Sequence, residues 1–187
     1  MKAAPDLLRS CTEGHSLSSK TNPRFSGGDV GARRGTLSIM VGANQEDFNA
    51  CLPIFQAMGT NIVLTGDCGC GQYTKMANQI AIVGALAGVC EATAYGQAHG
   101  LDGFNMLSCI SRGAAGSWQM ENLGPKMLKN DFAPGFFMKH FVKDMRIACQ
   151  SQNKLPVLET VFHLCEQLEQ KGFGEDGTQA LYRWYQS

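Results

Sequence analysis

The stretch from residue 70 to residue 99 constrains the fold of this chain more than any other. It holds seven alanines and no proline, and alanine favours the α-helix more than any other residue. Its longest apolar run, residues 80–90, covers eleven residues, which is too short for a transmembrane helix and is typical of a buried one. We therefore expect one long helix, with Gly100 as its C-terminal cap.

The residues on either side of this helix favour different structures. Upstream, residues 36–41 and 61–64 are rich in aliphatic side chains and are predicted to form strands, while Asn44 can cap a helix over residues 45–58. Downstream, glycines and prolines divide the chain into helices expected near residues 103–111, 116–129, 136–152, 155–171 and 177–186. The pattern predicts an α/β segment followed by an all-α segment.

Charge and composition exclude several classes of partner. Sixteen basic residues balance sixteen acidic ones, and no basic stripe follows the chain, so neither nucleic acid nor an anionic membrane is an expected partner. Residues 1–24 are polar and lack the long apolar stretch of a secretory signal. We expect this segment to be an unstructured leader.

The eight cysteines are scattered along the chain. This pattern is typical of a reducing compartment, so we expect an intracellular protein, either cytoplasmic or mitochondrial. Cys68 and Cys70 are close in sequence, but no second pair or histidine cluster completes a four-ligand zinc site, and we expect no metal. A redox-sensing role for this pair stays open.

The most informative polar residues follow the segment Gly69-Cys70-Gly71 at the start of the long helix. Lys75, Asn78 and Gln79 are spaced i, i+3 and i+4, so they share one helical face. An ammonium group and two carboxamides placed together can hold a small polar substrate. Taken alone, a lysine on a helix is more often solvated, and that alternative stays open at this point.

Four further motifs occur along the chain in a definite order. They are residues 26–32 (SGGDVGA), 113–118 (GAAGSW), 131–136 (DFAPGF) and 140–144 (HFVKD). Together with the segment around Lys75, they resemble the motifs of the β-hydroxyacid dehydrogenase family. That family includes 3-hydroxyisobutyrate dehydrogenase and tartronate semialdehyde reductase, and it is related to 6-phosphogluconate dehydrogenase. The resemblance extends from Phe25 to the C-terminus.

The resemblance implies a fold of two parts behind the leader. Residues 25–68 would be the C-terminal part of an NAD(P)-binding Rossmann domain. Residues 69–187 would be a helical domain like the C-terminal domain of 6-phosphogluconate dehydrogenase, which binds substrate and pairs subunits. Family members begin with a strand, a G-x-G-x-x-G turn and a helix that receives the cofactor pyrophosphate. The chain contains no such segment, so it resembles the second half of a two-domain enzyme.

The resemblance also implies an NAD(P)-dependent oxidoreductase that acts on a small β-hydroxyacid or its semialdehyde. Lys75 would be the general acid/base, and Asn78 would hold the substrate oxygen beside it. Ser26, Gly27 and Gly28 would bind the substrate carboxylate through a hydroxyl group and backbone N–H groups.

Two residues of the helical part complete the implied site. Trp118 would contact the substrate, and Lys143 would contact NAD or NADP. Each of these residues also has a purely structural interpretation. Trp118 could pack in the core, Lys143 could form a surface ion pair, Asn78 could bond to local backbone, and residues 26–28 could form an ordinary turn.

The motifs identify neither the substrate nor the choice between NAD and NADP. The resemblance implies a homo-oligomer that pairs through the helical domain. Because the chain contains no glycine-rich phosphate-binding turn, a second function stays open. In that alternative the chain is a truncated, non-catalytic product that acts as a dimerisation or regulatory partner.

Overall fold

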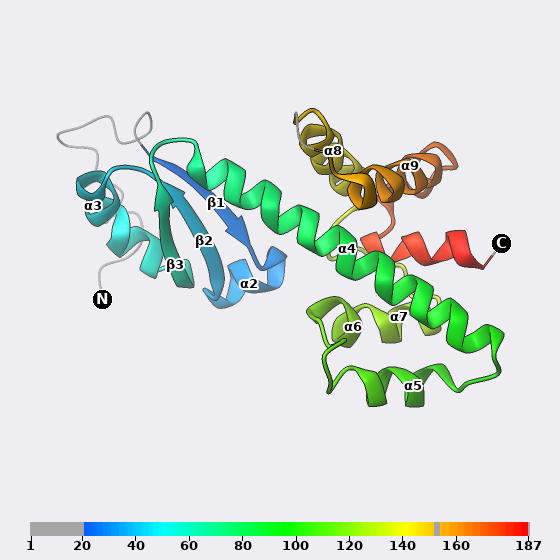
Figure 1. Ribbon diagram of the computed structural model, residues 1–187. Coiled ribbons are helices and arrows are strands. Elements are labelled where there is room, and N and C mark those ends of the chain that lie inside the picture. The colour runs from blue at the N-terminus through cyan, green and yellow to red at the C-terminus, as the bar shows by residue number, and fades with distance from the viewer. Residues whose placement is uncertain (1–20, 152–153, 187) are drawn as a thin grey trace. The chain divides into compact units, whose positions relative to one another are not determined.

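The computed structural model describes residues 21–151 and 154–186 (Figure 1). The chain forms two compact units, residues 1–78 and 79–187, which are described in turn. The long helix α4 (Cys70–Ala98) contributes to both units. The domain boundaries after residues 24 and 68 stay predictions, and residues 1–20 of the expected leader lie outside the described residues.

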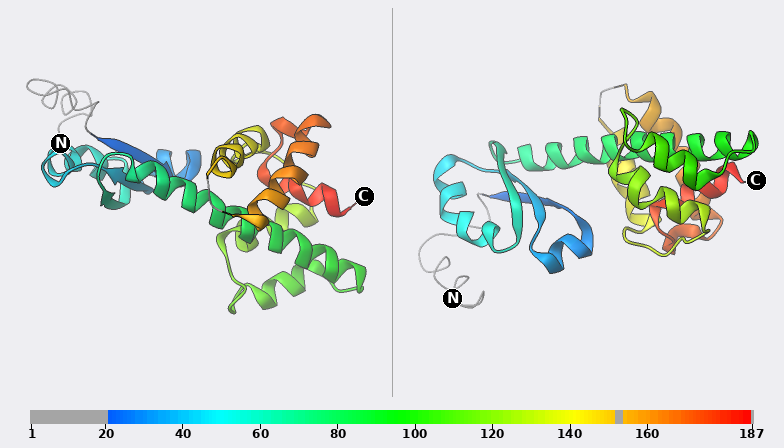
Figure 2. Two further views of the ribbon diagram at one scale, coloured as in Figure 1. Left: turned by 45° about the horizontal axis from the view of Figure 1, so that its top comes forward. Right: turned by 90° about the horizontal axis from the view of Figure 1, so that it is seen from below.

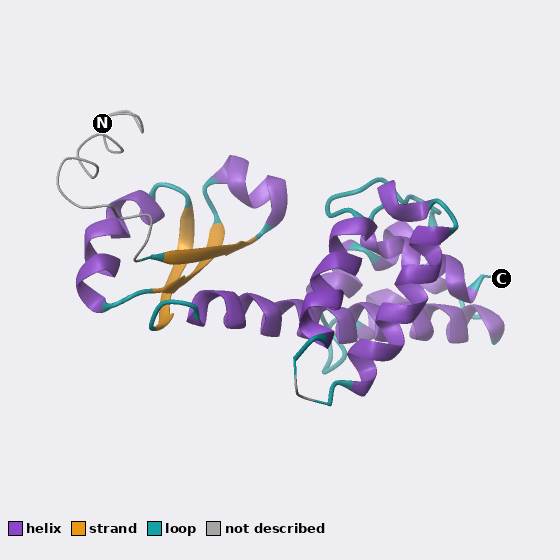
Figure 3. Ribbon diagram, turned by 90° about the horizontal axis from the view of Figure 1, so that it is seen from above, coloured by secondary structure: helices purple, strands orange, loops and turns teal. Residues whose placement is uncertain are grey.

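The first unit is built on a three-stranded sheet, drawn in orange in Figure 3. Its strands are β1 (Asn22–Ser26), β2 (Leu37–Gly42) and β3 (Gly59–Gly66), in the order β1-β2-β3. β1 runs antiparallel to β2, and β3 runs parallel to it. The parallel pair is joined by the helix α3 (Gln45–Gln56), as a parallel connection requires a crossover.

The core of this unit lies between β2 and α3. Alternate residues of a strand point to one face of the sheet, and the buried residues of β2 follow that rule. The core cluster consists of Leu37, Ile39, Val41, Ala43, Phe48, Cys51 and Phe55. The predicted cap of α3 is confirmed, because the Asn44 side chain accepts a hydrogen bond of 2.8 Å from the Asp47 N–H.

Two elements of the first unit were not expected. β1 begins at Asn22, inside the segment assigned to the leader, because its residues pair with β2 over their whole length. The helix α2 (Gly28–Arg34) follows directly. Its glycines lower intrinsic helix propensity, so local sequence does not indicate a helix there. Gly35, with φ of 66°, ends the helix by donating its N–H to backbone oxygens of the last turn.

The second unit contains the remainder of α4 and a set of shorter helices (Figure 2). They are α5 (Gly103–Ile110), α6 (Trp118–Asn122), α7 (Gly124–Leu128), α8 (Met138–Cys149), α9 (Pro156–Gln170) and the 3-10 helices η2 (Phe173–Glu175) and η3 (Thr178–Tyr185). The single helix expected over residues 116–129 is therefore two helices. Pro125 in the first turn of α7 lacks the N–H that a continuous helix would need.

α4 forms part of the core of this unit. By length and composition alone it could cross a membrane. Its residues Val83, Leu86 and Cys90, however, are buried inside the folded unit, which is the usual position of an apolar helix in a helical domain. The expected C-terminal cap is present: Gly100 has φ of 74° and donates its N–H to the Gln97 carbonyl at 3.0 Å.

The C-terminal helix η3 is bonded to the last turns of α4. The Tyr182 hydroxyl donates a hydrogen bond to the Gln97 side chain. The Tyr185 hydroxyl lies 3.3 Å from Glu91 Oε1. These bonds join residues 85 and 94 positions apart in sequence, and they connect the C-terminal helix to α4.

Candidate functional site

The start of α4 is held closely against the sheet of the first unit. A Cβ atom at position 71 would lie 2.8 Å from the Met40 carbonyl oxygen and closer still to that of Asn22. A Cβ atom at position 42 would lie 2.9 Å from the Gly71 nitrogen. Only glycine permits such a close approach of two backbones. The two glycines therefore fix where α4 leaves the sheet, and with it the position of the residues in its next turns.

Lys75 and Asn78 follow on this part of α4, and both side chains are half-buried. They are three residues apart, so their side chains are neighbours on one helical face. Both residues are therefore partly accessible to solvent. An acid/base group beside a carboxamide can exchange a proton with a bound oxygen and hold that oxygen in place.

Ser26, Gly27 and Gly28 lie where β1 ends and α2 begins. Gly27 has φ of 126° and Gly28 has φ of 61°, conformations that other L-residues rarely adopt. A Cβ atom at position 28 would meet nothing within 4 Å. The backbone at Gly28 is therefore open on the side where a side chain would stand, as backbone recognition of an anion requires.

In the second unit, two of the sequence motifs are joined by a buried polar contact. The Gln79 carboxamide of α4 donates a hydrogen bond of 2.8 Å to Asp144 Oδ2 of α8. Gln79 is 3% exposed and Asp144 is 9% exposed. The other oxygen of Asp144 lies 3.4 Å from the ammonium group of Lys143, whose side chain is 62% exposed. Asp144 thus contacts both a residue of the α4 motif and the lysine of the α8 motif.

Sequence reasoning placed Gln79 beside Lys75 and Asp144 beside Lys143. It did not predict the contact between Gln79 and Asp144. A signal was present in α8, where Phe141, Met145 and Ala148 are buried and position 144 falls on the same face. A carboxylate among apolar neighbours needs a hydrogen-bonding partner. The identity of that partner depends on how α4 and α8 pack, which local sequence does not specify.

Trp118 is the first residue of α6, and the residue is 63% exposed. The alternative that Trp118 packs in the core is therefore wrong. Ser117 caps the helix by accepting a hydrogen bond of 3.1 Å from the Met120 N–H. The cap orients the first turn of α6, and the indole ring stands in solvent where a ligand can reach it.

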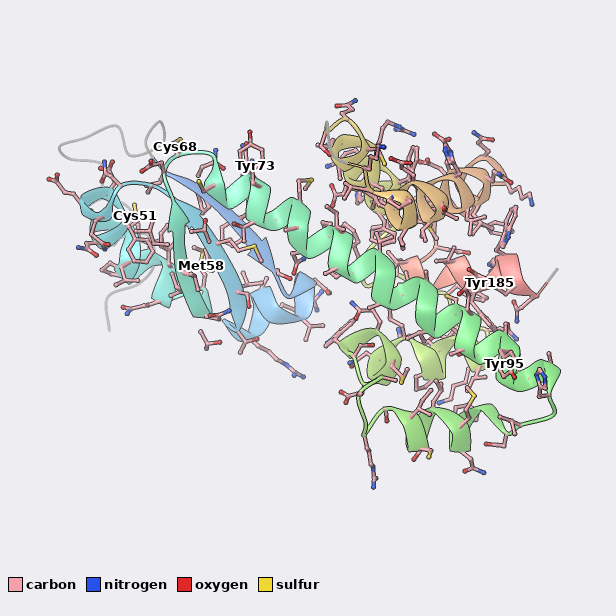
Figure 4. The ribbon with its side chains drawn as sticks, in the orientation of Figure 1. Cys51, Met58, Cys68, Tyr73, Tyr95 and Tyr185 are labelled. Carbon is pink, nitrogen blue, oxygen red and sulfur yellow. The ribbon has the colours of Figure 1, made fainter. Side chains whose placement is uncertain are left out.

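The predicted site residues are divided between the two units. Ser26, Gly27, Gly28, Lys75 and Asn78 belong to the first unit, whereas Trp118 and Lys143 belong to the second. Figure 4 shows the side chains of both units as sticks. Within the described part of the chain, no three residues of the types His, Cys, Asp and Glu are grouped so that they could hold a metal ion.

Two sequence families match the chain, one in each part. Residues 69–185, more than half of the chain, match the family described as NAD-binding of NADP-dependent 3-hydroxyisobutyrate dehydrogenase. Residues 24–66 match the NAD binding domain of 6-phosphogluconate dehydrogenase. The two matches meet within the β3–α4 segment, and their order agrees with the order expected from the motifs.

Several proteins of known sequence are similar to this chain. The Bacillus subtilis oxidoreductase YkwC is 49% identical over 162 residues, which cover 84% of this chain and 56% of YkwC. The probable 3-hydroxyisobutyrate dehydrogenase-like 1, mitochondrial, of Arabidopsis thaliana is 42% identical, over 83% of this chain and 48% of that protein. The 2-hydroxy-3-oxopropionate reductase of Escherichia coli is 38% identical, over 76% and 49%. The chain spans about half the length of these relatives.

Solved structures share the fold. The 3-hydroxyisobutyrate dehydrogenase of Salmonella typhimurium gives a TM-score of 0.82 at 21% identity, over 97% of this chain and 66% of that one. The Mycobacterium tuberculosis enzyme of that name, determined with L-serine, gives 0.82 at 20% identity, over 96% and 67%. The fold predicted from the sequence, the C-terminal part of a Rossmann-type domain followed by a helical domain, is thereby confirmed.

Proposed function

Because the chain belongs to the β-hydroxyacid dehydrogenase family, we propose that it carries the acid/base and substrate-binding residues of an NAD(P)-dependent oxidoreductase. Its substrate would be a small β-hydroxyacid or the corresponding semialdehyde. The observation that carries the proposal is that Lys75 and Asn78 lie on one face of a helix that glycine contacts hold against the sheet. This arrangement supplies a proton-transfer group and an oxygen-binding group in one place.

In the proposed reaction Lys75 handles the proton. When the alcohol is oxidised, the neutral amine of Lys75 accepts the hydroxyl proton. When the aldehyde is reduced, its ammonium group returns that proton to the oxygen. Asn78 donates a hydrogen bond from its carboxamide to the same oxygen and keeps it within reach of Lys75. NAD or NADP, when bound, accepts or supplies the hydride at carbon.

The substrate carboxylate would bind at Ser26, Gly27 and Gly28. The Ser26 hydroxyl and the N–H groups of the glycines are suitable donors, and the open backbone at Gly28 supports this assignment. A carboxylate held there and a hydroxyl group held at Lys75 define a short hydroxyacid. Trp118, the remaining residue predicted to bind substrate, is exposed.

Lys143 would contact the cofactor. Its ammonium group is exposed and lies beside Asp144, which restricts the side chain while leaving the charge reachable for an anionic group. The residues present match only part of what NAD or NADP requires, because the G-x-G-x-x-G turn that receives pyrophosphate does not occur among the 187 residues. Lys143 would therefore supply only one part of the cofactor contact.

A second candidate function is supported by the surface of α4. Ala81, Gly88 and Tyr95 are exposed, and a Cβ atom at position 84 or 88 would meet nothing within 4 Å. Such a face allows a second helix to approach closely. We propose that the chain forms homo-oligomers through this domain. A chain that pairs in this way without binding cofactor would act as a dimerisation or regulatory partner.

The first experiment is a fluorescence titration of NADH and NADPH with the 187-residue chain and with its Lys75→Ala variant. Saturable micromolar binding to both proteins supports the oxidoreductase proposal, because Lys75 is assigned to proton transfer and not to the cofactor. Turnover would then be measured with 3-hydroxyisobutyrate, tartronate semialdehyde and L-serine. Absence of binding in a folded sample contradicts the catalytic proposal and favours the partner role, which analytical ultracentrifugation would test.

A further inference from the structure

Cys68 and Cys70 lie in the turn that connects β3 to α4, and Figure 4 labels Cys68 on this loop. The turn is closed by a hydrogen bond of 2.9 Å from the Cys70 N–H to the Asp67 carbonyl. Gly69, between the two cysteines, has φ of 100°. Since one residue separates them within a tight turn, their Cα atoms are roughly 5–7 Å apart, a range that overlaps the span of a disulfide.

Both thiols belong to residues of this turn. Cys68 is exposed and Cys70 is half-buried. A Cβ atom at position 66 would lie 2.9 Å from Cys70 Sγ, so the Cys70 thiol lies over Gly66, directly before the turn. A Cβ atom at position 69 would meet nothing within 4 Å. Gly69 therefore has both the space and the conformational freedom to adjust if the sulfurs join.

The other described cysteines differ from this pair. Cys51, Cys90 and Cys165 are buried, and burial raises the pKa of the Cys165 thiol to about 12, which keeps it in the unreactive protonated form. Cys109 is exposed and Cys149 is half-buried, but neither has a cysteine near it in sequence. Cys68 and Cys70 thus combine access to solvent with a neighbouring thiol.

We propose that Cys68 and Cys70 form a redox-active dithiol that hydrogen peroxide converts to an intrachain disulfide. The thiolate of one cysteine attacks a peroxide oxygen, so an S–O bond forms, the O–O bond breaks and hydroxide leaves, which takes up the proton released by that thiol and becomes water. The second thiolate attacks the resulting sulfenic acid, so the S–S bond forms, the S–O bond breaks and a second hydroxide leaves, which takes up the proton of the second thiol. Two thiols are oxidised and one peroxide is reduced to two waters. A reducing dithiol reverses the step.

The disulfide would change the start of α4. The helix begins at Cys70, and Lys75 lies in its second turn. Closing a small ring across Gly69 alters the backbone that leads into this helix. We therefore expect the oxidised protein to have lower turnover, and this consequence rests on the function proposed above.

The dithiol is tested on the full chain by peroxide treatment, alkylation of the remaining thiols and mass spectrometry of the peptide that carries both cysteines. The expected product lacks two hydrogens, resists alkylation and recovers both thiols after dithiothreitol. Cys68→Ser and Cys70→Ser should abolish it, whereas Cys109→Ser, which removes an exposed thiol elsewhere, should leave it unchanged. Independent alkylation of both thiols after peroxide, or a disulfide between chains, would overturn the proposal.

Phenylarsine oxide gives a second measurement that needs no oxidation, because it bridges two neighbouring thiols. We expect one arsenical on the 68–70 peptide of the wild-type chain and none on that of either serine variant. For regulation, oxidised wild-type protein should lose turnover several-fold and regain it on reduction, while Cys70→Ser should be insensitive. If the reduced chain has no turnover, the proposed function fails while the mass and arsenical results still decide the dithiol.

Discussion

Gln79 and Asp144, which are 65 residues apart in sequence, form a hydrogen bond of 2.8 Å in the interior of the helical unit. The contact joins α4 to α8 and brings the lysine next to Asp144 into the same cluster. Because both side chains are buried, neither could be left without a partner at low cost.

The contact predicts the effect of shortening Asp144. Asp144→Ala leaves the buried Gln79 amide without its acceptor, so the free energy of unfolding should fall by about 1–3 kcal/mol. Asp144→Asn keeps an acceptor oxygen and should cost less. Lys143→Ala is the control, because the loss of an exposed ion pair should change stability by about 0–1 kcal/mol. Urea denaturation measures all three, and equal stabilities for Asp144→Ala and wild type would contradict the prediction.

Lys75 should determine turnover and not folding. Replacing it by alanine removes the proposed acid/base group, so kcat/KM should fall by about 10²–10⁴-fold, with the circular dichroism spectrum unchanged. Lys129→Ala, which removes an exposed lysine of the helical unit, is the matched control and should keep turnover. The assignment of Lys75 would be wrong if both variants retained the wild-type rate.

Two glycines of α4 should respond oppositely to alanine. At position 71 a Cβ atom meets the backbone oxygens of Asn22 and Met40, so Gly71→Ala should destabilise the first unit by about 1–3 kcal/mol. At position 84 the Cβ atom meets nothing within 4 Å, and the better helix propensity of alanine should raise stability by up to about 1 kcal/mol. Thermal unfolding of the monomeric chain distinguishes the two variants. A loss at position 84 equal to that at position 71 would disprove the close-approach argument.

Tyr185 should make the folded state sensitive to alkaline pH. Burial, and then the negative charge of Glu91, raise the pKa of Tyr185 above its ordinary value of 10.0. The unfolded chain therefore releases this proton at a lower pH than the folded chain does. The stabilisation is complete below pH 10 and is lost as the pH rises further.

The free energy of unfolding, measured from pH 8 to pH 11, tests the direction of this pKa shift. Tyr185→Phe should reduce the loss of stability at the alkaline end, because it removes the group that titrates differently in the two states. Tyr95→Phe, which alters an exposed tyrosine of α4, should leave the pH profile of the wild type unchanged. A steeper alkaline loss in Tyr185→Phe would show that the assigned direction of the pKa shift is wrong.

Much of the architecture could be predicted from local patterns. The alanine-rich, proline-free stretch after Gly69 predicts α4 to within one residue at its C-terminus, and Asn44 predicts the start of α3. The unexpected elements had weak local signals. α2 contains glycine at two of its seven positions, and β1 is a strand of five residues that depends on pairing with β2. The C-terminal turn was expected as an α-helix but is the tighter 3-10 form.

The candidate site also combines features that local sequence predicts with features that depend on tertiary packing. Sequence spacing alone placed Lys75, Asn78 and Gln79 on one helical face, because helical periodicity is a local property of the chain. It could not decide whether Trp118 is core or surface, since exposure depends on what packs around α6, and the structure leaves the ring in solvent. The positive φ angles at Gly27 and Gly28 likewise become visible only when β1 and α2 are in place.

By itself, the sequence determined the long helix and most of the other elements, the family to which its motifs belong and the residues that can carry the chemistry. Only the tertiary structure decided that Gln79 bonds to Asp144 and that Gly71 lies against Asn22 and Met40. The physical reason is that helices and turns arise from interactions between residues a few positions apart. Buried polar pairs and close backbone contacts join distant segments, and they are selected only when the whole unit packs and desolvates them.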